Sequence, residues 1–175
     1  MVAWRRNLVD VSRREVGAGV VAAVVALFAS LISLSALDFS PLSLSTDAQY
    51  WFGYAPLFAA LAGLMVGTVA WRRAMSRAST PERGALVGIA TAVGIVVLVP
   101  ILAGLYVILF PIVLGLVTGE EWSQILRVFP AYVWASVDVT RTVAVSWSPL
   151  VGLVLVPLGA LGGWAYQRGR RSRSR

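Results

Sequence analysis

The chain alternates long apolar runs with short polar segments. Each of four uncharged runs exceeds the roughly 20 residues that a helix needs to cross a ~30 Å hydrocarbon core. These runs cover residues 16–37, 48–71, 84–119 and 142–167. The pattern predicts an all-α integral membrane protein in which residues 1–175 form a single four-helix membrane domain. The expected transmembrane helices span residues 16–37, 52–71, 85–110 and 149–166.

The third run is too long for a single crossing. As one helix, residues 85–118 would extend ~51 Å at 1.5 Å per residue, compared with a hydrocarbon thickness of ~30 Å. The helix must therefore either project from the membrane or break. Pro111 is the expected break, because it removes a backbone donor and crowds the preceding turn. Residues 111–148 then form an insertion outside the cytoplasm.

Within this insertion, the pattern predicts a short amphipathic helix on the outer side of the membrane. Thr118 and Glu121 have the spacing of a capping box at its start. Pro130 is expected to end the helix. The apolar face recurs at i, i+3, i+4 and i+7 and consists of Trp122, Ile125, Leu126 and Phe129.

Residues 131–148 follow this helix and contain Asp138 and Arg141. Their conformation stays open. In a helix the two charged residues lie three apart and can pair, whereas in a strand they point to opposite faces. A fifth crossing here would place the two arginine-rich ends of the chain on opposite sides of the membrane. We therefore expect Asp138 and Arg141 to form a pair on the outer surface.

The placement of arginine predicts the orientation. The net charge of +7 arises from fifteen arginines and no lysine. Thirteen of the arginines precede the first run, separate the second from the third, or follow the last. This positive-inside pattern predicts a multi-pass protein of the cell membrane with both termini cytoplasmic. The 22-residue first run is longer than a signal-peptide core, so we expect it to be retained. Arginine without lysine indicates a prokaryotic source.

Both ends of the chain are basic. In residues 1–15, Trp4, Leu8 and Val11 share one helical face, as in an amphipathic segment on an anionic leaflet. Residues 168–175 are expected to form a disordered cytoplasmic tail, for which lipid contact is favoured over nucleic-acid binding. The arginines expected to contact anionic lipid are Arg5, Arg6, Arg72, Arg73, Arg168 and Arg170.

Two sets of matches point to an internal repeat. The sequence from Pro56 to Trp71 resembles that from Pro149 to Trp164, at an offset of 93 residues. Residues 15–23 resemble residues 82–90, at an offset of 67 residues. The matches are explained either by a two-helix hairpin duplicated in parallel or by the convergent composition of membrane helices.

The composition excludes several chemistries. Without cysteine or histidine there can be no disulfide, no thiolate or imidazole metal site and no histidine-based triad. No phosphate-binding loop or metal-ligand spacing occurs, so we assign no catalytic, cofactor-binding or metal-binding residue and expect no cofactor. The four expected spans contain no charged residue, which argues against proton coupling within one chain.

Small and polar residues inside the spans have structural explanations. The polar ones are expected to bond to their own helix or to a neighbouring one, and are Ser30, Ser33, Thr68, Thr91 and Tyr106. Two prolines, Pro100 and Pro157, lie inside the spans. Each should leave the carbonyl four residues earlier without its hydrogen-bond donor. Glycines spaced at four permit close helix contact, within the chain or between copies, and are Gly63 with Gly67, Gly84 with Gly88, and Gly159 with Gly163.

These patterns favour a non-enzymatic accessory or scaffolding membrane protein that acts through helix packing with itself or a partner. Its expected partners are the lipid bilayer and either a second copy or another membrane protein, with no nucleic acid. The alternative is a small permease or channel subunit whose pore forms only in an oligomer and is lined by Ser30, Thr68 or Thr91. A polar passage would support this alternative, whereas a closed apolar bundle would support the scaffold.

Overall fold

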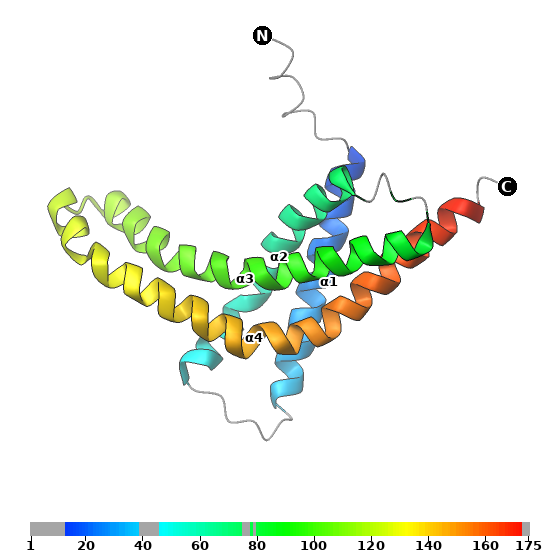
Figure 1. The fold of residues 1–175 in the computed structure, drawn as a ribbon. Helices are drawn as coiled ribbons and strands as arrows, with labels where there is room; N and C mark the ends of the chain where they lie inside the picture. Colours follow the sequence, from blue (N-terminus) through cyan, green and yellow to red (C-terminus); the bar gives the residue numbers. More distant parts are fainter. Residues whose placement is uncertain (1–12, 39–45, 75–77, 79, 173–175) are drawn as a thin grey trace, which may run out of the picture.

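The computed structural model describes residues 13–38, 46–74, 78 and 80–172, and this part of the chain is all-helical. Its helices are α1 (Arg13–Asp38), α2 (Thr46–Arg73), α3 (Pro81–Thr118) and α4 (Trp122–Ser172) (Figure 1). All four are long and apolar enough to cross a membrane. The prediction of a helical protein with four such helices is therefore confirmed.

The helices form two antiparallel hairpins that cross each other. Figure 1 shows α1 beside α2, and α3 beside α4, with the second hairpin lying across the first. With 38 and 51 residues, α3 and α4 would extend ~57 Å and ~77 Å if straight. The start of α1, the end of α2, the start of α3 and the end of α4 lie at one end of the molecule, which we call the arginine-rich end.

Two predicted helix breaks are wrong. Pro111 lies inside α3 and Pro130 lies inside α4. An internal proline removes one hydrogen bond, but α3 and α4 pack against each other along most of their length, and this packing offsets the loss. Residues 131–148 are helical as part of α4, so the extended alternative is excluded. α4 also continues to Ser172, which makes the first part of the predicted disordered tail helical.

The predicted capping box is also wrong, because Thr118 ends α3 instead of preceding the next helix. Its hydroxyl donates to the carbonyl of Leu114 at 3.0 Å and to that of Gly115 at 3.2 Å. The chain then reverses at Gly119, whose φ of 78° is left-handed. The amide of Glu120 donates to the Gly115 carbonyl at 2.9 Å, which completes a glycine-based helix end.

The second hairpin bends near its middle (Figure 1). Pro100 lies at the midpoint of α3 and cannot donate to the carbonyl of Val96. The Ser148 hydroxyl of α4 donates to that carbonyl instead, at 3.3 Å. The predicted orphan carbonyl therefore exists, and the neighbouring helix supplies its donor. Beyond the bend, residues 107–118 and 122–138 extend away from the first hairpin, and we call them the projecting arm.

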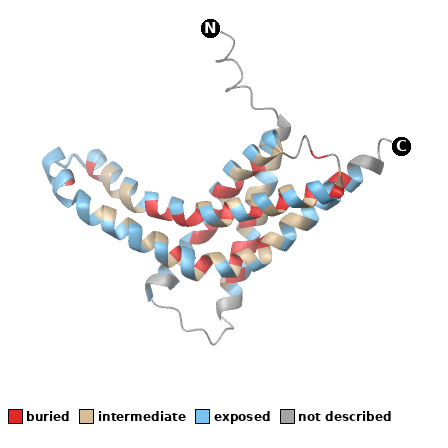
Figure 2. Cartoon of the chain, in the orientation of Figure 1, coloured by how far each residue is buried: buried red, intermediate tan, exposed pale blue. Residues whose placement is uncertain are grey.

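Buried residues gather where the two hairpins cross and along the contact between α3 and α4 (Figure 2). Trp147 of α4 is only 1% exposed, and its indole N–H donates to the Ser30 hydroxyl of α1 at 3.2 Å. This core is built mostly from small residues, which allows the helices to approach closely.

The glycines spaced at four serve contacts within the chain. A Cβ at Gly63 would lie 2.7 Å from the carbonyl oxygen of Ala22, so α1 and α2 touch through their backbones. Gly88 and Gly159 face each other across α3 and α4 in the same way, and a Cβ at Gly159 would lie 2.5 Å from the Gly88 oxygen. Gly84 faces Gly163 one turn further along. The structure thus decides between the two roles that the sequence left open.

The internal repeat remains a prediction. Gly17 and Gly84 correspond in the proposed alignment, yet Gly17 is exposed while Gly84 is buried against Gly163. Pro56 and Pro149 also correspond, and the first is buried while the second is exposed. Both hairpins are antiparallel, but these differences argue against the register in which the repeat was aligned.

Candidate functional site

A groove of about 390 Å³ lies between the two hairpins toward the arginine-rich end. α2 and α3 form its floor, where Gly67, Gly88 and Ala92 are buried. α1 and α4 form its rim, and rim residues such as Val21 and Leu158 are exposed. The groove therefore opens sideways between α1 and α4. It forms because the hairpins cross near Trp147 and Ser30 and separate from there toward the arginine-rich end.

The lining is almost entirely apolar. Thr91 contributes a hydroxyl, which donates to the Val87 carbonyl of its own helix at 2.7 Å. At one end the rings of Trp71 and Tyr166 meet edge to face, with centroids 4.8 Å apart. Such a surface gains dispersion contacts from an apolar chain but offers little to an ion or a sugar.

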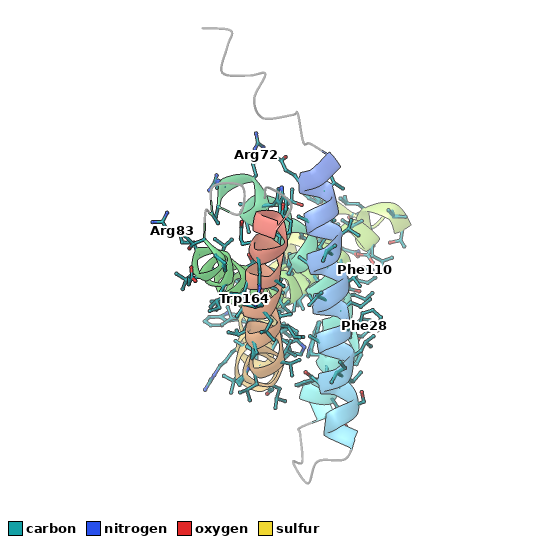
Figure 3. All side chains as sticks on the ribbon, turned by 90° about the vertical axis from the view of Figure 1, so that its right-hand side faces the viewer. Phe28, Arg72, Arg83, Phe110 and Trp164 are labelled. Carbon is teal, nitrogen blue, oxygen red and sulfur yellow. The ribbon has the colours of Figure 1, made fainter. Side chains whose placement is uncertain are left out.

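Arginines cluster beside the aromatic end of the groove. Arg72 directly follows Trp71, and Arg168 lies two residues beyond Tyr166. Figure 3 shows Arg72 at the end of α2 and Arg83 near the start of α3, both pointing away from the helices. The described charged side chains of this end are Arg72, Arg73, Arg83 and Arg168, with Glu15 and Glu82 of opposite sign. This region therefore carries an excess of positive charge.

The structure brings together part of the predicted lipid-contact set. Arg72, Arg73 and Arg168 are exposed at the same end of the molecule. The guanidinium carbon of Arg168 lies 4.8 Å from the centroid of the Trp164 ring, in a cation–π contact. Two predicted contacts, Arg5 and Arg6, lie outside the described residues, as does the side chain of Arg170.

Asp138 and Arg141 do not belong to this site. Both are exposed on α4, beyond the bend and away from the arginine-rich end. Of the two conformations left open by the sequence, the helical one that places them three residues apart is observed, while their pairing on the outer surface stays a prediction.

The polar residues proposed to line a pore bond to the protein instead. Thr68 and Thr91 each donate to the carbonyl one turn earlier in their own helix at 2.7 Å, and Ser30 accepts from Trp147. Ser33 donates to the Ala29 carbonyl in the same way, at 2.8 Å. In the part of the chain that the structure describes, every buried side-chain nitrogen or oxygen has a hydrogen-bond partner. The predicted structural role of these residues is confirmed.

Sequence reasoning identified the arginines but missed the groove. The groove is lined by small residues of the same types that make close helix contacts. In the sequence of an apolar helix, a glycine that lines a groove looks the same as a glycine that packs against another helix. Gly162 and Gly163 illustrate this: a Cβ at Gly163 would strike the Gly84 backbone, whereas one at Gly162 would meet nothing within 4 Å. The contact between α3 and α4 distinguishes them.

Comparisons of the chain with models of protein families, with curated proteins and with solved structures find no match.

Proposed function

We propose that this chain is a non-enzymatic accessory or scaffolding protein of the cell membrane, acting through helix packing with itself or a partner protein. The observation that carries the proposal is the projecting arm, which leaves the bundle with large apolar side chains uncovered (Figure 2). On α3 these are Leu109, Phe110, Val113, Leu114, Leu116 and Val117. On α4 they are Trp122, Leu126, Val128, Phe129, Trp134 and Val137.

The proposed membrane placement follows from lengths and charges. α1, α2 and the near halves of α3 and α4 cross the bilayer, with the arginine-rich end and both termini in the cytoplasm. The α3 part of the projecting arm has 12 residues (107 to 118), or ~18 Å as a helix, which is too short to cross ~30 Å. The arm therefore lies along the outer surface of the membrane.

A polar stripe on α4 supports this placement. Arg127, Asp138 and Arg141 are all exposed. At 3.6 residues per turn their directions fall within about 60° of one another. This side of the helix faces headgroups and water, as in an interfacial amphipathic helix.

An arm in this position needs a cover for its remaining apolar surface. The α3 part is apolar on all sides, and α4 covers one of them. At the membrane interface the rest would contact water, and large exposed apolar patches of this kind mark protein contact sites. The proposed partner is therefore another helical membrane protein or a second copy of this chain.

Affinity purification of the tagged chain from its native membranes tests the proposal. We expect a second copy or a membrane protein to co-purify, and the double variant Val113→Ser/Val117→Ser to lose it, because the change makes the arm polar. The matched control is Val20→Ser/Val24→Ser, which alters two exposed valines at the same spacing on α1. A monomer without partners, or equal retention by both variants, would contradict the proposal.

A further inference from the structure

We propose that the groove between the hairpins binds one acyl chain of an anionic phospholipid, whose phosphate is held at the arginine-rich end. The inference rests on the proposed membrane placement. It assigns a class of ligand to the groove, which has no part in the proposed scaffolding function.

The shape of the groove selects a lipid chain over a protein helix. Its volume of about 390 Å³ lies in the range of small-ligand sites. A helix with its side chains is roughly 10–12 Å across, so it cannot enter a wedge of this size between the two hairpins. A flexible hydrocarbon chain can follow the wedge and touch both hairpins.

The opening of the groove faces the region where acyl chains lie. Because exposed residues of α1 and α4 form the rim, the groove opens sideways into the proposed hydrocarbon core, not toward water. An empty apolar wedge would forfeit dispersion contacts along its whole lining. A lipid chain restores these contacts without bringing any polar group into the groove.

The end of the groove specifies the headgroup. The contact between Trp71 and Tyr166 places the ends of α2 and α4 side by side, and Arg72 directly follows Trp71 at this aromatic end. Arg168 stacks on Trp164, on the side of α4 that faces away from the groove. Guanidinium groups match a phosphate with paired donors. Glu15 and Glu82 lie at the same end, and the four described arginines outnumber them. A negatively charged headgroup is therefore preferred over a zwitterionic one.

The test measures which lipids stay bound to the full-length protein. The purified chain is exchanged into nanodiscs of equal parts dioleoylphosphatidylglycerol and dioleoylphosphatidylcholine, then released into the gas phase for native mass spectrometry. We expect a complex with one phosphatidylglycerol to dominate. Replacing Arg72 with glutamine should lower the phosphatidylglycerol preference roughly fivefold.

Gly162→Leu is the decisive variant, because its side chain enters the groove from a position where an added Cβ meets nothing within 4 Å. Gly53→Leu is the matched control, also exposed and unobstructed but outside the groove. We expect Gly162→Leu to lose the bound lipid and Gly53→Leu to keep it, with unchanged thermal unfolding in both. Retention of one anionic lipid by Gly162→Leu would overturn the inference while leaving membrane insertion intact. Failure of the wild-type chain to enter nanodiscs would overturn both proposals.

Discussion

Valine in place of Gly88 is expected to lower the stability of the protein by about 3 kcal/mol, in the upper part of the range for overpacking a close contact. Gly88 and Gly159 bring the backbones of α3 and α4 together, so a side chain at either position meets main-chain atoms that cannot rotate away. The two helices must therefore move apart, and the contact between α3 and α4 is lost along the half of the hairpin nearer the arginine-rich end.

A second glycine of the same hairpin provides the control for this change. Gly162→Val introduces the same side chain on the same hairpin, where an added Cβ has open space. Denaturation by sodium dodecyl sulfate in mixed micelles, followed by circular dichroism, measures both variants. Equal midpoints for the two would contradict the close backbone contact between α3 and α4.

Trp147→Ala is expected to cost about 3 kcal/mol, near the lower end of the range for a buried tryptophan. Trp147 is 1% exposed at the crossing of the hairpins and bonds to Ser30. Its removal leaves a cavity between helices that small side chains cannot fill.

Packing and hydrogen bonding at Trp147 can be separated. Trp147→Phe retains most of the ring volume but removes the N–H donor, and Ser30→Ala removes the acceptor. In a double-mutant cycle, the coupling between these two changes should be about 0.6 kcal/mol, the average for hydrogen bonds between membrane helices. The same micelle denaturation provides the values. A Trp147→Ala variant as stable as the wild type would show that the crossing is not held at this residue.

Apolar run length predicted the number of helices because a helix in hydrocarbon must satisfy all its backbone groups internally. It failed at Pro111 and Pro130, where local preference and tertiary packing conflict. The missing donor of Pro100 shows how such a conflict is resolved, since Ser148 bonds to the Val96 carbonyl from the opposite helix. That partner is 52 residues away along the chain, so the local pattern could not have revealed it.

The candidate site was partly predictable for a related reason. Arg72 and Arg168 follow apolar runs, and their position at helix ends was evident from the sequence. The groove beside them arises from the angle between two hairpins, which no single segment encodes. Trp147 shows the same limit: a tryptophan near the end of an expected span is typical of the interface, yet α4 continues and buries it.

The central claim is that two hairpins cross, with the arginine-rich end inside the cell and the projecting arm on the outer surface. Because the chain contains no cysteine, single cysteines can be introduced and tested in intact cells with a membrane-impermeant maleimide. We expect Glu120→Cys and Asp138→Cys to be labelled from outside, and Arg83→Cys and Arg168→Cys only after permeabilisation. Labelling of Glu120→Cys and Asp138→Cys from opposite sides, or of Arg168→Cys in intact cells, would contradict the account.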